Sequence, residues 1–280
     1  MTQIPYKRGL VRMLDVYGST NVEDKMQADV MICSNVLVPS HSERRDVPRK
    51  GCLPSFGKTL ILDLKKTEEE LFAAIHKNAR YKINRAMKRD SIYHKSYTNP
   101  SDNLLERFIA FFDTFSKNKK IPKANMGRLK ELRAQGAILL SFVEDEQEQI
   151  LCSHVHVVNG RCCSLLHSAS ARFDNRDIRN VIGRANRYLH WMDICEAKSM
   201  GVDWYDFGGL FVDSKSAEEE HINRFKKEFG GQEVDVDKRI YPNSIIGKMV
   251  VFLFWVKMRK RPEFLRGKAK WQQRYSISDT

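Results

Sequence analysis

The pair Asn159-Gly160 is the feature that most limits the folds open to this chain of 280 residues. An Asn-Gly pair between apolar runs favours a two-residue hairpin, because the tight turns that suit paired strands need positive φ angles. Apolar runs lie on both sides, at 150–158 and 161–170, and a further one at 137–143 precedes a charged turn. Residues 137–170 are therefore predicted to form an antiparallel meander.

A regular succession of elements follows the predicted meander. Residues 178–200 carry an apolar stripe with helical spacing, and 203–207 form a short apolar strand. A helix is predicted at 218–229 and a last strand at 232–240. A meander followed by helix, strand, helix and strand predicts an α+β fold, with a mixed sheet packed by helices.

The N-terminal part carries weaker signals. Residues 1–64 are predicted to hold short strands and loops, and a helix begins near Thr67, where Thr67 and Glu70 form a capping box. The apolar stripe of that helix consists of Leu71, Ile75, Ala79, Ile83 and Met87. Its second half is rich in cations, among them Arg80 and Arg85. These cations indicate either a phosphate-binding ridge or an ordinary solvated face.

The charge of the chain is concentrated at its C-terminal end as well as on that helix. The net charge of +13 favours anionic partners such as nucleic acid, phosphorylated substrates or an acidic membrane surface. Residues 245–258 are strongly apolar but too short to span a bilayer, and a basic tail follows. We interpret 1–64 as part of the main domain, 65–244 as its centre and 245–280 as an appended helix and tail. That segment suits an anionic membrane surface or a helix docked on the domain.

Cysteine usage and the N-terminus indicate a compartment. The six cysteines form no Cys-x-x-Cys pair, and Met1 to Leu10 lack the apolar core of a secretory signal. We therefore expect a reducing cytoplasm, with peripheral attachment to the inner face of the cell membrane if the tail binds lipid. Cys152, Cys162 and Cys195 lie in apolar segments and are predicted to be buried thiols.

Three histidines lie in the predicted meander. His154 and His156 share one face of a strand, but no third ligand has a spacing that suits zinc, so no metal is predicted. We interpret that face as half-exposed. His167 lies near the end of the third strand, where it is either a proton acceptor within reach of a substrate or a structural histidine.

The strongest candidate site is a strand end followed by a returning helix. Asp206 precedes Gly208-Gly209, and the helix carries Phe225 and Lys226 before Gly230-Gly231, a predicted C-cap. Two glycines permit positive φ angles or a close approach of the backbone to a ligand. A carboxylate, an open backbone and a lysine could hold an anionic or carbonyl substrate. The same pattern is typical of a strand, a turn and a helix with an ordinary surface lysine.

Four stretches resemble the Fem family of aminoacyltransferases, which extend peptidoglycan precursors with aminoacyl-tRNA, and looser relatives from bacterial polysaccharide gene clusters. In order they are NARYKINRA at 78–86, YLHW at 188–191 with AKSMG at 197–201, YDFGG at 205–209, and FKKEFGG at 225–231. The resemblance covers roughly 59–240 and implies an acetyltransferase-type (GNAT-like) fold, which in this family is often built as two related halves. This chain is short for that arrangement and lacks a long helical insertion, so a truncated N-terminal half is expected.

The resemblance also implies an activity. It predicts an acyltransferase that forms an amide on an amino group of a cell-envelope glycan, nucleotide-sugar or lipid-linked precursor. An aminoacyl-tRNA or an acyl-CoA would be the donor, as a co-substrate and not a resident cofactor. By the same resemblance Lys226 stabilises the oxyanion, Phe225 restricts its approach, and Asp206 orients the amine or accepts its proton. Together with the residue patterns above, the candidate substrate-binding residues are Arg80, Arg85, His167, Trp191, Tyr205, Gly208, Gly209 and Phe225.

Two alternatives remain. An acyl-CoA enzyme would need a glycine-rich loop for pyrophosphate at a helix N-terminus, and Asn180 to Ala185 resembles one only in part. The apolar stripe through those residues places them inside a helix, which favours a donor other than CoA. The other alternative is a non-catalytic module that binds nucleic acid or anionic lipid through the basic segments.

Overall fold

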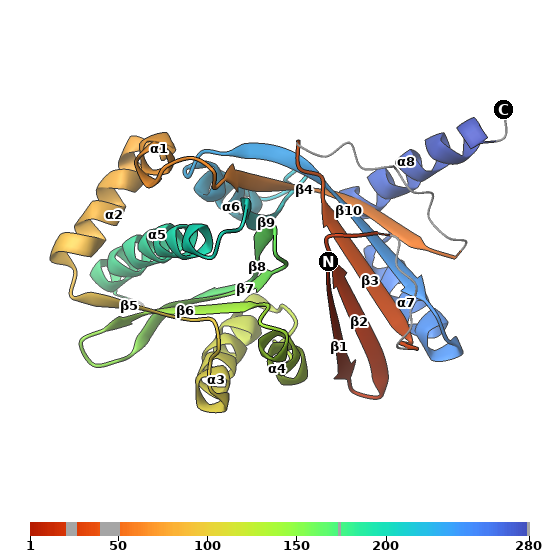
Figure 1. Ribbon diagram of the computed structural model, residues 1–280, viewed down its shortest axis with the longest axis horizontal. Coiled ribbons are helices and arrows are strands. Elements are labelled where there is room, and N and C mark those ends of the chain that lie inside the picture. Colours follow the sequence, from red (N-terminus) through yellow and green to blue (C-terminus); the bar gives the residue numbers. More distant parts are fainter. Residues whose placement is uncertain (21–26, 40–50, 173–174, 279–280) are drawn as a thin grey trace. The chain divides into compact units, whose positions relative to one another are not determined.

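A computed structural model describes residues 1–20, 27–39, 51–172 and 175–278 of the chain. In chain order, the elements of these residues are β1(Thr2–Arg8), β2(Val11–Tyr17), β3(Val30–Val36), β4(Leu53–Asp63), α1(Glu68–Ala74), α2(Lys77–Arg89), β5(Ile92–Tyr97), α3(Asp102–Lys119), α4(Met126–Ala134), β6(Ile138–Asp145), β7(Ile150–Val158), β8(Cys162–Ser170), α5(Arg176–Ser199), β9(Trp204–Leu210), α6(Ala217–Lys227), β10(Gln232–Pro242), α7(Ile245–Met258) and α8(Pro262–Ser278) (Figure 1). The mixed α+β composition predicted from the sequence is confirmed.

The chain divides into two compact units. Unit 1 comprises Met1–Leu60, Gly209–Arg224 and Glu233–Thr280, and unit 2 comprises Ile61–Gly208 and Phe225–Gln232. The strands β4 and β9 each pass from one unit into the other, as does α6. The division predicted from the sequence, at 64 and 244, was drawn from composition and remains a prediction.

Unit 2 is a mixed sheet between helices. Its strands follow the order β9-β8-β7-β6-β5, with antiparallel pairing from β5 to β8 and parallel pairing of β8 with β9. In Figure 1, α5 covers one face of these strands, α3 and α4 cover the other, and α2 packs on α5. The predicted meander is confirmed, and Gly160 adopts a φ of +81° in the hairpin turn.

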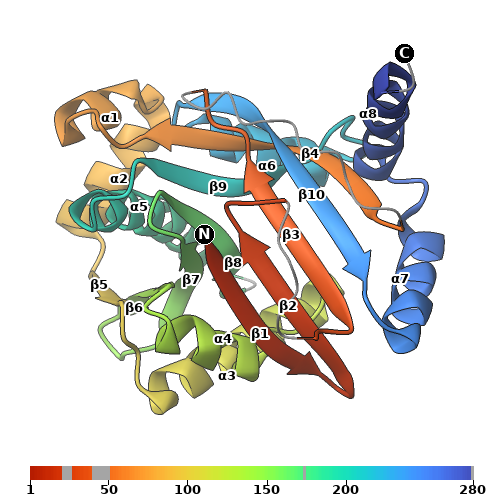
Figure 2. The ribbon, with the colours of Figure 1, turned by 45° about the vertical axis from the view of Figure 1, so that its right-hand side comes forward.

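Unit 1 also contains strands that pair in mixed directions. Its strands follow the order β1-β2-β3-β10-β4, with β2 and β3 parallel (Figure 2). Here α7 packs against β3, and α8 approaches β4 so closely that a Cβ at Gly267 would lie 2.6 Å from the carbonyl oxygen of Pro54. The segment after 258, expected from the sequence as a basic tail, is therefore a helix in close contact with a strand.

The predicted helix from 67 to 89 is two helices. Ile75 ends α1 in an extended conformation, and the side chain of His76 caps α2. The capping box of Thr67 and Glu70 is confirmed, with Glu70 donating its backbone N–H to Thr67 Oγ1 at 3.2 Å. The predicted last residue of the apolar stripe is wrong, because Met87 is exposed and Ala86 is buried instead. The change of direction at Ile75 rotates the faces of the second helix.

The cysteines are free thiols. Burial raises the pKa of Cys152 to about 12, as expected for a thiol enclosed by apolar neighbours. Cys162 is also buried, whereas Cys195 is only half-buried, contrary to the prediction. Cys195 lies on α5 near Glu68 of α1, at the margin of the core.

Candidate functional site

The candidate site of unit 2 lies where two parallel strands stop pairing. The pairing of β8 with β9 covers three residue pairs and ends at Ser164 and Asp206. One residue further along, β8 bulges against β7, between Leu165 and His167. Asp206 therefore lies in the last pair that β9 forms with β8, and Gly208 lies two residues further, near the end of β9.

Lys226 reaches this strand end from the last turn of α6. Its Nζ donates to the carbonyl oxygen of Gly208 at 3.1 Å, and the N–H of Gly208 donates to Asp206 Oδ1 at 2.9 Å. Gly208 has a φ of +72°, and a Cβ there would lie 3.1 Å from the carbonyl oxygen of Leu165. Only glycine combines this φ angle with so close an approach. Lys226 and Asp206, which the sequence placed in one candidate site, thus both bind the backbone of Gly208.

The electrostatics of this pair depend on burial. Burial lowers the pKa of Lys226 to about 8, and the charge of Asp206 opposes that shift. Asp206 itself is buried. A lysine with a pKa near 8 is charged in a substantial fraction of molecules at neutral pH and can also release its proton, so the group is suited to charge stabilisation or to proton transfer.

The end of α6 is held in place by aromatic and ionic contacts. The ring of Phe225 packs on His190 and Phe229, with ring centroids 5.5 and 5.7 Å apart. The guanidinium of Arg187 lies 4.8 Å from the centroid of the Phe225 ring and forms an ion pair with Glu228 at 2.7 Å. These contacts hold the Phe225 ring in place, and the role that the resemblance implies for Phe225 beside Lys226 remains a prediction.

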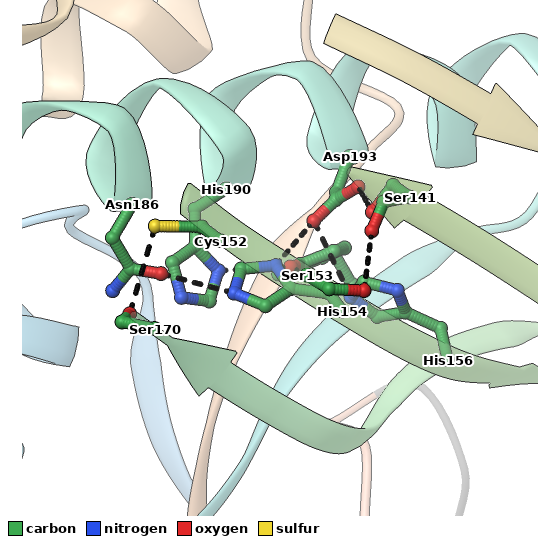
Figure 3. Close-up of polar contacts among 10 residues, drawn as sticks. Ser141, Cys152, Ser153, His154, His156, Ser170, Asn186, His190 and Asp193 are labelled. Carbon is green, nitrogen blue, oxygen red and sulfur yellow. Dashed lines mark hydrogen bonds and ion pairs between the residues drawn. The ribbon is translucent and has the colours of Figure 1, made fainter. Parts of the chain in front are cut away.

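A buried polar cluster joins α5 to the strands of unit 2 (Figure 3). His154 Nδ1 lies 2.6 Å from Asp193 Oδ2, and Ser141 Oγ donates to Asp193 Oδ1 at 2.6 Å. The hydroxyl of Tyr205 lies 3.0 Å from His156 Nε2 and 3.1 Å from His190 Nδ1. Since His190 also touches Phe225, the cluster is in contact with the helix that carries Lys226.

Burial keeps two of these histidines neutral. It lowers the pKa of His156 to about 4 and holds the pKa of His190 well below its usual range, where the positive charge of Lys226 adds to the effect. Burial opposes the charge of Asp193, but the nearby His156 and the hydrogen bonds of His154 and Ser141 leave its pKa lowered. The cluster thus places the Asp193 carboxylate near two rings, His156 and His190, that burial keeps uncharged.

The interpretation of the face that carries His154 and His156 as half-exposed is wrong. Both side chains are fully buried, because α5 covers their face of the sheet. A third potential ligand also exists, since His154, His190 and Asp193 present ligand atoms within 4.8 Å of one another. However, Asn186 and Asp193 already engage both ring nitrogens of His154, so these residues form a closed hydrogen-bonded network as they stand.

Two further predicted residues, Trp191 and Tyr205, lie in the core of unit 2. Trp191 is buried edge-on against Phe72 of α1, with ring centroids 4.9 Å apart. Tyr205 is fully buried in the polar cluster described above. His167 is half-buried and packs against Phe112 of α3, with ring centroids 4.6 Å apart. Substrate contact through these side chains remains a prediction, and the contacts seen here are structural.

The two arginines of α2 differ in their surroundings. Arg80 donates through Nη1 to the carbonyl oxygens of Ala73 and, at 2.9 Å, Ile75, so it caps the C-terminus of α1. Arg85 is exposed, and its Nε lies 4.0 Å from Asp90, which Arg184 binds more closely at 2.5 Å. Of the two, Arg85 has the guanidinium that is better placed to meet a phosphate.

Sequence reasoning missed the polar residues of α5. Asn186, His190 and Asp193 were given no role of their own on the predicted helix, yet they supply the α5 side of the buried cluster. A signal existed, because His190 and Asp193 are spaced three apart on the face that also carries the buried Leu189. Polar side chains on a buried helical face need partners, and the strand histidines are the partners here.

Comparisons with known proteins support the fold. No family model and no curated protein matches the sequence. Among solved structures, FemX matches with a TM-score of 0.56 and 13% identity, over 84% of this chain and 83% of FemX. The C-terminal domain of a protein assigned as a lysylphosphatidylglycerol synthetase from Agrobacterium fabrum matches with a TM-score of 0.51 and 9% identity, over 89% of this chain and 83% of that chain. The Fem-like fold predicted from the four stretches is thereby confirmed at the level of the fold.

Proposed function

We propose that this chain is an acyl- or aminoacyltransferase that forms an amide on an amino group of a cell-envelope glycan, nucleotide-sugar or lipid-linked precursor. The observation that carries the proposal is Lys226, a half-buried lysine with a pKa lowered to about 8, placed 3.1 Å from the carbonyl oxygen of Gly208 and beside Asp206. A lysine with a strongly lowered pKa beside a carboxylate is typical of a functional site. The fold shared with FemX supports the same reaction class.

The proposed chemistry is nucleophilic addition followed by loss of the donor. The acceptor amine attacks the carbonyl carbon of the donor ester or thioester, a C–N bond forms, and negative charge develops on the carbonyl oxygen. The ammonium of Lys226 stabilises that oxyanion in a site with little water. The C–O or C–S bond of the donor then breaks, and the amine proton passes to the leaving group, directly or by way of Asp206.

The proposal favours an aminoacyl ester as donor over acyl-CoA. Residues Asn180 to Ala185 lie inside α5, so their backbone N–H groups belong to the helix and do not form a loop around a pyrophosphate. In addition, the structural neighbour from Agrobacterium fabrum is assigned as a lysylphosphatidylglycerol synthetase, and the product named there carries a lysyl group on a phospholipid. An aminoacyl-tRNA would supply such a group in activated form.

A phosphate of donor or acceptor is proposed to meet the cations of α2. Arg85, Lys88 and Arg89 are exposed on one helix, and its acidic neighbour Asp90 is already paired with Arg184. Exposed arginine can bind a phosphate bidentately. Arg80 contributes indirectly, because it fixes the start of α2 through the carbonyl oxygens at the end of α1.

The test compares cell-envelope precursors from cells with and without this protein by mass spectrometry, with Lys226→Ala and Lys227→Ala expressed in the deficient cells. The parent protein should add one acyl or aminoacyl mass to an amino-bearing precursor, and the exposed Lys227→Ala variant should restore it. Lys226→Ala should lower the turnover number on the order of a hundred- to a thousandfold, with little change in KM. Full product formation by Lys226→Ala would contradict the proposal.

A further inference from the structure

The helix α7 presents apolar side chains to solvent along most of its length. Exposed fractions reach 86% for Ile245, 62% for Leu253 and 59% each for Met249 and Phe252. Its buried residues are Gly247 and Val251, which face β3. A folded domain seldom exposes so many large apolar side chains together, and such a patch marks an interaction surface.

Five of the exposed apolar side chains share one outer face. At about 100° per residue, Ile245, Met249, Phe252, Leu253 and Val256 fall within roughly 100° of the helix circumference, opposite the side of Gly247 and Val251. Lys248 and Lys257 flank this apolar face, one on each side. The helix therefore has an apolar centre between two cationic borders.

The anchor of α7 keeps that face outward. The hydroxyl of Ser244 accepts from the N–H of Gly247 at 3.0 Å and donates to Asp29 at 2.7 Å. A Cβ at Gly247 would lie 1.9 Å from the carbonyl oxygen of Asp29, so the backbone of the helix rests directly on the loop before β3. Because the opposite side is fixed by contacts this close, α7 cannot rotate to bury its apolar face against unit 1.

The charges around the face identify its partner. Lys257, Arg259, Lys260 and Arg261 are exposed at the C-terminal end of α7, and α7 contains no acidic residue. Among the described residues, none of these four forms an ion pair, whereas Arg266 and Lys270 of α8 are paired with Asp235. A second copy of the chain docked on the same face would bring these cations against one another. A partner for this face must accept its apolar side chains and balance its cations. A negatively charged surface above an apolar interior does both.

We infer that α7 binds the surface of a lipid bilayer that contains anionic headgroups. The helix lies in the plane of the interface, with Met249, Phe252 and Leu253 inserted to a depth of about 5–10 Å. Lys248 and Lys257 extend toward the phosphates, and Trp255 lies at the headgroup level, where its ring is favoured. No helix in the described part of the chain is long and apolar enough to cross a membrane, so the contact is with one face of the bilayer.

Vesicle flotation of the full chain tests this inference. The protein should float with phosphatidylcholine vesicles that contain phosphatidylglycerol, and far less with phosphatidylcholine alone or at high salt. Phe252→Ser with Leu253→Ser should weaken binding at least about tenfold, since two large apolar side chains lose their insertion. Lys248→Gln and Lys257→Gln should each weaken it about fivefold. Brominated acyl chains should quench the fluorescence of the parent more than that of Trp255→Phe.

Matched controls separate membrane insertion from general surface changes. Leu10→Ser alters an apolar side chain that is 94% exposed at the turn between β1 and β2, and Lys117→Gln removes an exposed cation of α3. Both should bind like the parent, and circular dichroism should show all variants folded. Equal flotation of the Phe252 and Leu253 double variant, or no flotation of the parent at low salt, would overturn the inference. Formation of a dimer that the double variant disrupts, without lipid binding, would assign the face to a second copy instead.

Discussion

At the scale of single residues, Lys226 has a pKa that distinguishes its two conceivable roles. Burial lowers that pKa to about 8, so the side chain is charged below pH 8 and neutral above it. If the ammonium stabilises an oxyanion, kcat should hold below pH 8 and fall as the pH rises through that value. If the neutral amine accepts a proton, kcat should rise through the same value. We expect the falling limb, measured as the pH profile of kcat.

Lys226→Arg is the control for this assignment. A guanidinium stays protonated throughout the accessible range, so the falling limb near pH 8 should disappear while kcat drops at all pH values, because the planar fork cannot occupy the place of a compact ammonium. Lys227→Ala should keep the parent profile. A falling limb that persists in Lys226→Arg would show that another group titrates there.

At the scale of elements, Gly231 shows how closely the turn after α6 approaches Ile61 inside unit 2. Gly231 has a φ of +86°, and a Cβ there would lie 2.4 Å from the carbonyl oxygen of Ile61. Gly201 has a similar φ of +73°, but its Cβ would meet nothing within 4 Å. Gly201→Ala should therefore cost about 1–2 kcal/mol of unfolding free energy from backbone strain alone.

Gly231→Ala should cost clearly more than Gly201→Ala, because the backbone of β4 must move as well. Thermal unfolding of both variants measures the difference. If the two variants had equal melting temperatures, the close approach of Gly231 to Ile61 would not exist in solution.

The elements also show what the sequence could and could not predict. The meander around Asn159-Gly160 and the helix α5 were predictable, because a hairpin pair and a long apolar period are local signals. The break between α1 and α2 was not, since the four-residue spacing continues across it. It depends on tertiary contacts, such as the N–H of His76 donating to the carbonyl oxygen of Glu228 at 2.7 Å.

The candidate site also has parts that the sequence could predict and parts that it could not. The strand end with Asp206 and the helix with Lys226 could be recognised from glycines and local charge. The burial of His154 could not, because it depends on Asn186 and Asp193, more than thirty residues further along. Periodicity along one strand does not reveal which helix will cover it.

At the scale of the whole molecule, the buried histidines couple stability to pH. His156 faces Tyr205 of β9 and Asp193 of α5, with His154 beside it on β7. Its pKa is about 4 in the folded chain, against 6.5 for an ordinary histidine. Between these values the unfolded chain binds the proton and the folded chain does not, so stability falls as the pH drops from about 6.5 to about 4.

The contribution of His156 to this pH dependence is large enough to measure. The difference between 6.5 and about 4 corresponds to on the order of 3 kcal/mol of unfolding free energy, since each pH unit is worth about 1.4 kcal/mol. His156→Gln keeps an amide that can meet the Tyr205 hydroxyl but cannot titrate, so its stability should fall less between pH 7 and pH 4 than that of the parent. His221→Gln, at an exposed position of α6, should leave the slope unchanged. Denaturant unfolding at a series of pH values provides the measurement. A slope in His156→Gln as steep as in the parent would mean that His156 is accessible to protons in the folded chain, and the closed network between α5 and the sheet would have to be rejected.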